Sequence, residues 1–208
     1  MTPMVARSIQ RLLFAGGCFL FLAVVNGQAV ARSGDRVNLD FSSDAGGKSW
    51  APLNDTIMGG RSTGRFEPIE GAMRFSGTLS QENRGGFASI RGEERPVDLA
   101  ETEGFELRVR GDGRTYSLML WTDDTPDRVY YTASLAPPAG EWATLTLRWN
   151  DFKPYFRGFW VAQKDLDPSR ITSIGMMISD GRAGPFTLDI QWLRSREKTG
   201  SAEIGVDG

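Results

Sequence analysis

Short segments in which apolar and polar residues alternate, separated by glycine- and proline-containing turns, recur along almost the whole chain. The clearest runs from Phe105 to Arg110, where every second residue is apolar. A period of two is typical of a half-buried β-strand, because successive side chains of a strand point to opposite faces. Roughly ten such segments, and no stretch with the period of an amphipathic helix, predict a single all-β domain, a sandwich or a barrel. The only helical feature that we expect is one turn at Leu166–Ile171, where Pro168 follows Asp167.

Two pairings of these segments and one buried face can be expected from the turns and the apolar residues. Ile69-Glu70-Gly71 joins two alternating segments in a predicted hairpin, and Gly111-Asp112-Gly113 joins two more. In the last strand we expect every second residue to face the core. The segments are 63–68 with 72–79, 105–110 with 115–122, and the inward-facing set Phe186, Leu188, Ile190 and Trp192.

The first 31 residues are typical of a secretory signal peptide. Arg7 and Arg11 precede an apolar run at 12–25, and Ala29-Val30-Ala31 matches the small-residue cleavage pattern. The run is shorter than the roughly 20 residues of a membrane span, so we expect cleavage after Ala31 and no stable membrane insertion. The prediction is therefore an exported protein, periplasmic or extracellular, with a domain at 32–196 and a flexible polar tail at 197–208.

Composition excludes several kinds of chemistry. The chain has no histidine and one cysteine, Cys18, which leaves with the signal. Ser-His-Asp and Cys-His catalysis and Cys/His zinc sites are therefore impossible. Without Arg7 and Arg11 the domain has 22 Lys+Arg against 26 Asp+Glu, so a nucleic acid partner is not expected. We predict no cofactor and no metal; the composition leaves open only metals with oxygen ligands, such as a structural calcium.

The segment from Asn54 to Ser62 combines short polar side chains with two adjacent glycines. Asn54 and Asp55 can accept hydrogen bonds from nearby backbone N–H groups, and Gly59 and Gly60 can adopt positive φ without a Cβ clash. One interpretation is a tight structural loop, in which Asp55 accepts backbone bonds or pairs with Arg61. The other is a polar patch at the end of the sandwich that holds a ligand.

The residue sequence of this segment, together with later motifs, resembles the complex I intermediate-associated protein 30 (CIA30) family. The resemblance covers most of the predicted domain, and its motifs follow in the same order. They are Phe41, Trp50, Asn54–Ser62, Phe75-Ser76-Gly77, Gly85–Ser89, Trp149–Phe152, Arg157-Gly158, Ile174-Gly175 and Gly184–Leu188.

The resemblance implies a fold and a function. It implies a two-sheet jelly-roll β-sandwich of the galactose-binding type, and a non-enzymatic domain that binds a partner protein during assembly or folding. A carbohydrate-binding module of the same fold is the alternative, and a carboxylate glycosidase is a distant third. The predicted export signal departs from family members that act on complex I in mitochondria, so that role does not simply transfer.

Candidate site residues fall into a binding set and a structural set. Tyr155, Phe156, Phe159 and Trp160 form a predicted aromatic loop that is hard to bury, and exposed apolar clusters often mark interaction sites. Six loop aspartates could pair for glycoside hydrolysis or bind calcium: Asp123, Asp124, Asp127, Asp165, Asp167 and Asp180. The binding set is Asn54, Asp55, Arg61, Tyr155, Arg157, Phe159 and Trp160; the structural set is Met58, Gly59, Gly60, Ser62, Gly85, Gly86, Phe87 and Gly158.

Overall fold

The computed structural model describes residues 36–42, 47, 49–126, 129–156, 159–162 and 164–198. This part of the chain forms thirteen β-strands and four short 3-10 helices, and it contains no α-helix. The helices are η1 (Asp55–Met58), η2 (Glu82–Arg84), η3 (Trp149–Asp151) and η4 (Pro168–Arg170). The predicted signal peptide at 1–31 and the tail beyond Lys198 lie outside the described residues.

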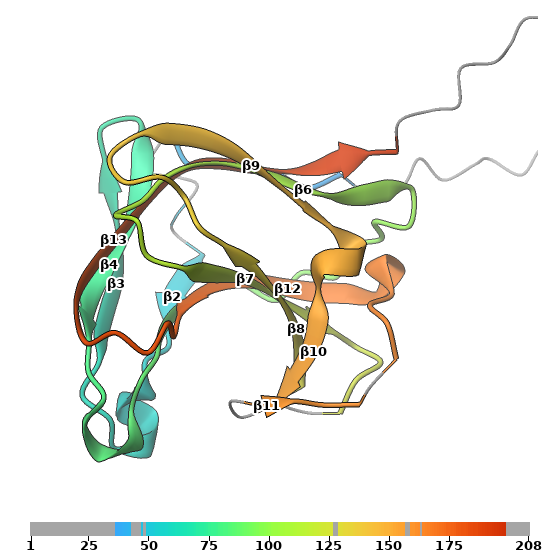
Figure 1. The fold of residues 1–208 in the computed structure, drawn as a ribbon. Helices are drawn as coiled ribbons and strands as arrows, with labels where there is room; N and C mark the ends of the chain where they lie inside the picture. Colours follow the sequence, from blue (N-terminus) through green and yellow to red (C-terminus); the bar gives the residue numbers. More distant parts are fainter. Residues whose placement is uncertain are drawn as a thin grey trace, which may run out of the picture. The chain divides into compact units, whose positions relative to one another are not determined.

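The strands form two antiparallel sheets, which Figure 1 shows as separate layers. Sheet A has the order β3 (Thr63–Ile69), β4 (Ala72–Leu79), β13 (Gly184–Glu197), β6 (Thr102–Arg110) and β9 (Trp142–Arg148), and β1 (Asn38–Asp40) pairs with β13. Sheet B has the order β11 (Phe159–Trp160), β10 (Lys153–Phe156), β8 (Tyr130–Leu135), β7 (Tyr116–Thr122), β12 (Ile171–Ile178), β5 (Ala88–Gly92) and β2 (Trp50–Pro52).

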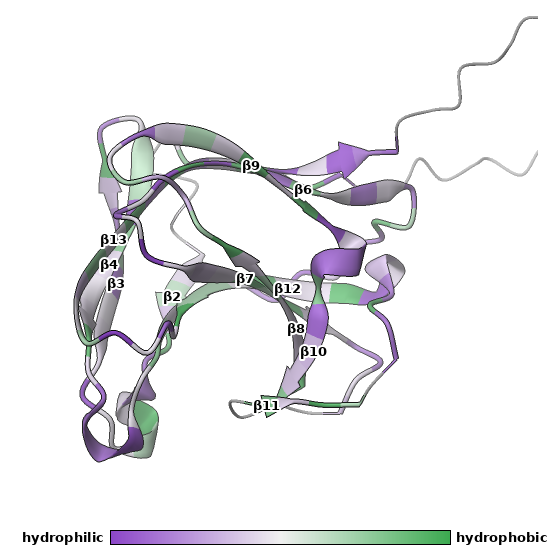
Figure 2. Ribbon diagram, in the orientation of Figure 1, coloured by the Kyte–Doolittle hydropathy of each residue, from purple (hydrophilic) through white to green (hydrophobic). Residues whose placement is uncertain are grey.

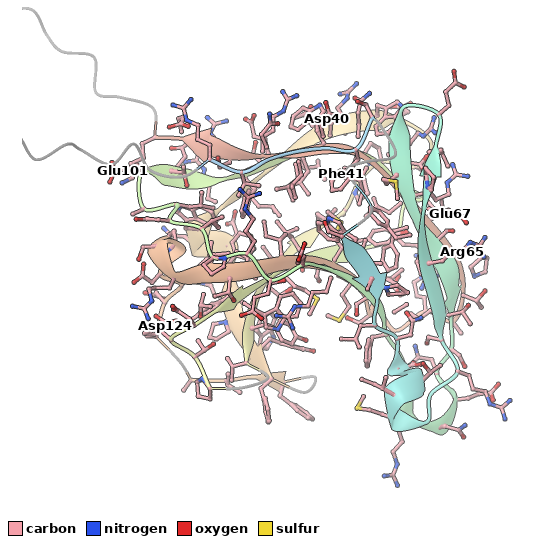
Figure 3. The ribbon with its side chains drawn as sticks, turned by 180° about the vertical axis from the view of Figure 1, so that it is seen from behind. Asp40, Phe41, Arg65, Glu67, Glu101 and Asp124 are labelled. Carbon is pink, nitrogen blue, oxygen red and sulfur yellow. The ribbon has the colours of Figure 1, made fainter. Side chains whose placement is uncertain are left out.

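The core lies between the two sheets, and both contribute alternate side chains to it. Phe105, Leu107 and Val109 of β6 are fully buried, as the alternation predicts, and Leu118 and Leu120 of β7 meet them from sheet B. On the opposite side of sheet A, Arg65 and Glu67 of β3 point away from the interior (Figure 3). The predicted two-sheet β-sandwich is confirmed, and so are the hairpin of β3 with β4 and the helical turn η4, where the Asp167 side chain accepts the Ser169 N–H at 3.0 Å.

The second predicted hairpin is wrong. Segments 105–110 and 115–122 follow each other in sequence, but β6 pairs with β13 and β9 in sheet A, whereas β7 pairs with β12 and β8 in sheet B. The turn at Gly111–Gly113 therefore carries the chain from one sheet to the other. Alternation identifies a strand and its two faces, but it does not identify the neighbouring strand.

Two further expectations change with the register. Trp192 does not continue the buried face of β13, because the pairing with β6 shifts between Ile190 and Trp192, and the fully buried position passes to Leu193. Such a bulge moves all later side chains to the opposite face. The predicted aromatic loop is instead a strand hairpin at the edge of sheet B, in which Tyr155 lies opposite Trp160.

Candidate binding groove on the outer face of sheet B

A groove of about 1190 Å³ runs along the outer face of sheet B, on the side away from the core. Its floor consists of outward-facing residues of β5, β12, β7 and β8. One wall is made by Leu53, η1 and the segment 81–87, and the opposite side is made by Val129, Tyr130 and Tyr155. A smaller hollow of about 170 Å³ continues it toward Trp160, and the two share Tyr155, Met177 and Ser179.

Four aromatic side chains form a row across this face, perpendicular to the strands. The register places Trp121 of β7 beside Tyr130 of β8, then Tyr155 of β10, then Trp160 of β11. Successive ring centroids are 5.7, 5.6 and 5.0 Å apart, and the ring planes are inclined by 41°, 52° and 77°. The rings therefore pack against one another as cross-strand aromatic pairs. Burial raises the pKa of the Tyr130 hydroxyl, so Tyr130 is neutral at physiological pH.

The wall of the groove is held by Asp55, which has no exposed surface. One carboxylate oxygen accepts the Ser62 N–H at 2.9 Å. The other accepts the Ser62 hydroxyl at 2.6 Å, the Gly86 N–H at 2.7 Å and the Phe87 N–H at 3.3 Å. Burial opposes ionisation of Asp55, but these hydrogen bonds outweigh it and keep its pKa below the usual value. Asp55 thus ties the loop at 54–62 to the segment that leads into β5.

The wall contains two pairs of adjacent glycines, and in each pair one glycine has positive φ while the other leaves space for Asp55. Gly59 has φ +87° and Gly86 has φ +136°, which favour glycine. Gly60 and Gly85 allow a close approach instead, because a Cβ at Gly60 would lie 2.4 Å from the Asp55 Cγ, and one at Gly85 would lie 2.5 Å from an Asp55 carboxylate oxygen. The expectation of positive φ therefore holds for Gly59, whereas Gly60 is needed for space around Asp55.

Large apolar side chains are exposed at the η1 wall of the groove and at the edge strand β11, where Trp160 lines the smaller hollow. Ile57 and Met58 of η1 are 68% and 66% exposed, and Phe159 and Trp160 of β11 are 73% and 64% exposed. Figure 2 shows green, hydrophobic colour at η1 and at β11, both of which lie toward the bottom of the view. We call these four residues the apolar lips. Leu53, 41% exposed, also lines the groove and completes the set of exposed large hydrophobic residues in the described part of the chain.

The remaining predicted site residues are not brought together at one point. The Asn54 amide nitrogen donates to the Gly64 carbonyl at 3.2 Å, behind the wall. Arg61 is exposed and pairs with Glu82 at 3.1 Å, not with Asp55. Phe87 lines the groove. Arg157 and Gly158 lie outside the described residues.

The loop aspartates that the structure describes are mostly engaged by cations. Asp123 pairs with Arg170 at 2.5 Å, Asp124 with Lys164 at 2.5 Å and Asp180 with Arg114 at 2.6 Å. Asp127 lies outside the described residues. Within the described ranges, no three acidic, histidine or cysteine side chains converge as a metal ion would require.

Sequence reasoning did not select Arg91, Met119, Tyr130 or Met177, which line the floor. In the structure they alternate with core residues and lie on the outward face of their strands, but the strand order that turns this face into a groove cannot be read from any single segment of the sequence. Trp121 is one of six tryptophans in the sequence. No signal distinguished it from the others.

The sandwich and its groove place the protein in the class of galactose-binding-like β-sandwiches, and solved structures of carbohydrate-binding modules share the fold. The family 11 module of a cellulosomal cellulase from Clostridium thermocellum aligns with a TM-score of 0.60 and 15% identity, covering 80% of this chain and 96% of the module. The module from the same organism in complex with a β-1,3-1,4-mixed-linked tetrasaccharide aligns with a TM-score of 0.58 and 15% identity, covering 77% and 95%.

The sequence itself identifies the family. The Complex I intermediate-associated protein 30 (CIA30) family matches residues 39–190, and the chain belongs to this family. The mitochondrial Complex I intermediate-associated protein 30 of Neurospora crassa is 27% identical over 198 residues, an alignment that covers 80% of this chain and 71% of that protein. No helix among the described residues has the length and apolar character to cross a membrane.

Proposed function

We propose that this protein is a non-enzymatic binding domain that holds an apolar segment of a partner protein in the groove of sheet B, as an assembly factor of the CIA30 type. The observation that carries this proposal is the position of the apolar lips. Exposed large hydrophobic residues are scattered on most protein surfaces, whereas a cluster beside a groove is typical of an interaction site. Here Leu53, Ile57 and Met58 line the groove, and Trp160 lines the smaller hollow that shares Tyr155 with it; Phe159, next to Trp160, lines neither.

The groove is also built to keep its shape without a ligand. The charged hydrogen bonds of Asp55 fix the wall that carries Ile57 and Met58, and β11 is fixed to β10 by strand pairing. A preformed site loses less conformational entropy on binding than a mobile one. Met58, Met119 and Met177 add flexible side chains that can adapt to different apolar partners.

A saccharide is the second candidate ligand, and the aromatic row from Trp121 to Trp160 favours it. Aromatic faces stack on the apolar faces of sugar rings, and the two Clostridium thermocellum modules share this fold. Two features favour a protein segment over a saccharide as the ligand. The rings of the row are inclined by 41° or more to one another, so they offer no single flat platform. Ile57 and Met58 are aliphatic, and they do not stack on sugars.

The absence of catalysis is part of the proposal. The ion pairs of Asp123, Asp124 and Asp180 support it, because these carboxylates are occupied by cations rather than aimed at a shared substrate position. We propose no cofactor and no metal. Export after cleavage at Ala31 also stays part of the proposal, although the Neurospora crassa relative is mitochondrial; Arg7, Arg11 and the apolar run that follows support it.

Site-specific photo-cross-linking in the native host tests the proposal. A photoreactive phenylalanine analogue replaces Met58 or Trp160 in the full-length protein, and Arg65 serves as a control position because it points outward from β3, in the other sheet (Figure 3). We expect protein adducts from Met58 and Trp160 and none from Arg65. The melting temperature should not change, since all three side chains are exposed.

Two results would contradict the proposal. One is a set of adducts that is the same at all three positions, which would mean non-specific contact. The other is an absence of adducts at both lips combined with retardation of the wild-type protein by a mixed-linkage β-glucan in affinity electrophoresis. The second result would establish the saccharide reading instead.

A further inference from the structure

Arg91 is the one arginine of the described chain that lies on the groove floor, and its position is closely defined. It projects from β5 toward β12, and its Cζ lies 4.0 Å from the centroid of the Trp121 ring. Its Nε donates to the Ser173 hydroxyl at 3.1 Å, and that hydroxyl donates to the Gly92 carbonyl at 3.0 Å. The stacked ring and the hydroxyl together hold the guanidinium in one orientation.

The backbone beneath this pair is shaped to admit the ring. Gly175 of β12 lies between Arg91 and Met119 in the register. A Cβ at Gly175 would lie 2.9 Å from Trp121 Cζ3 and 3.1 Å from Trp121 Cη2, so the indole covers a position where no other residue fits. The Arg91–Trp121 pair therefore rests on a glycine of the central strand.

The terminal nitrogens of Arg91 have no partner among the described residues, in contrast to other half-buried or buried arginines. Arg74 and Arg110 both bind Asp189, and Arg114 donates from Nε and Nη2 to Asp180 and from Nη1 to the Gly184 and Pro185 carbonyls. For Arg91, no carboxylate of the described chain lies within ion-pairing distance. Burial lowers the pKa of Arg91, and the nearby charge of Glu94 acts in the opposite direction. The cation is thus partly desolvated without a direct counter-charge.

We propose that Arg91, held by Trp121 and Ser173, is a carboxylate-binding position in the groove, and that the partner segment carries an acidic side chain between apolar residues. This inference rests on the proposed function. The terminal N–H groups of a guanidinium match a carboxylate in a bidentate arrangement, and such bonds are about twice as strong as neutral ones. The apolar lips take the residues that flank the acid.

The other charged residues that line the groove are compatible with this assignment. Asp123 is paired with Arg170 at 2.5 Å. Arg84 and Glu94 are exposed, Arg84 at the wall and Glu94 beyond the end of β5. The charge of Glu94 acts on Arg91, but no ion pair joins the two within the described part of the chain. The Arg91 guanidinium is therefore the cation that a ligand on the floor meets.

A peptide selection followed by a double-mutant cycle tests the inference. A random dodecapeptide library displayed on phage is selected on the immobilised full-length protein, and we expect enriched sequences with Asp or Glu between apolar residues. A selected peptide and its Glu→Gln or Asp→Asn counterpart are then titrated by fluorescence polarisation. We expect wild type to prefer the acidic peptide by about tenfold or more, and Arg91→Gln to bind both equally.

Two further variants keep the test interpretable. Arg65→Gln changes the net charge by the same amount on the outside of sheet A, and it should leave the preference intact. Arg91→Lys keeps the charge but loses the fork and the stacking, so its preference should be intermediate. If Arg91→Gln lowers the melting temperature, Arg91→Lys replaces it in the comparison with wild type.

The contrary outcomes separate this inference from the proposed function. A selected pool without an acidic position, or an equal loss with Arg65→Gln and Arg91→Gln, overturns the role of Arg91 while peptide binding at the lips stands. A failure to enrich any peptide overturns both, as does binding that is confined to a uronate oligosaccharide such as oligogalacturonate.

Discussion

Replacing Asp55 with asparagine tests whether the groove wall depends on a buried charge. The asparagine oxygen can take the place of the carboxylate oxygen that accepts from Ser62 Oγ, Gly86 and Phe87, and it then keeps those three bonds in weaker, neutral form. The amide NH₂ must then face the Ser62 N–H, which loses its acceptor. One buried donor without an acceptor costs about 1–3 kcal/mol, and the loss of charge assistance adds to it. We expect Asp55→Asn to lower the free energy of unfolding by about 3 kcal/mol.

The pH dependence gives this prediction a second, independent signature. Because the folded pKa of Asp55 lies below its unfolded value of about 3.9, its stabilisation is fully present well above that value and is lost as the pH falls through it toward the folded pKa. Urea unfolding between pH 7 and pH 3 should therefore show the gap between wild type and Asp55→Asn narrowing below about pH 5. Asp151→Asn is the matched control, since Asp151 is exposed and accepts one backbone N–H, from Arg148 at 2.7 Å. The reasoning is refuted if Asp55→Asn costs no more than Asp151→Asn at pH 7, or if its deficit is the same at every pH.

Two other predictions concern the wall and the start of the mature chain. Gly60→Ala should destabilise the fold by about 1–3 kcal/mol, because the new Cβ meets Asp55 at 2.4 Å; Gly59→Ala has open space and should cost about 1 kcal/mol, from its positive φ alone. Denaturant unfolding of both variants decides this, and equal losses would mean that space around Asp55 is not limiting. N-terminal sequencing of the protein from its host should begin at Arg32, whereas a start at Met1 or acylation at Cys18 would contradict export by signal cleavage.

The fold could be predicted from the sequence wherever the information was local. Alternation identified β6 and the β3–β4 hairpin, and Asp167 with Pro168 marked η4. Pairing between distant segments could not be read in this way, because the same alternation in 105–110 and 115–122 is compatible with one sheet or two. The bulge near Trp192 was equally hidden. A single extra residue reverses the faces without changing the composition of the strand.

For the candidate site too, local features could be predicted from the sequence and contacts between distant segments could not. The glycines and short polar residues of 54–62 indicated a self-bonded loop, but they did not reveal that Gly60 and Gly85 converge on one carboxylate from segments far apart in sequence. Phe159 and Trp160 were selected because apolar residues in a glycine-containing turn are hard to bury. Arg91 and Trp121 were not, because their relation depends on the register of β5, β12 and β7.

The order of strands in sheet B also bears on when the groove can form during synthesis. β5 (Ala88–Gly92) and β12 (Ile171–Ile178) are neighbours on the floor, although about 80 residues separate them along the chain. A chain that leaves the ribosome from its N-terminus offers η1 and β5 long before β12 is available to join them, and contacts of this span are slow to form. The proposed binding site is therefore complete only in the finished chain. A nascent or C-terminally truncated copy would carry Ile57 and Met58 without the floor beside them, and we expect it not to compete with the complete protein for the proposed partner segment.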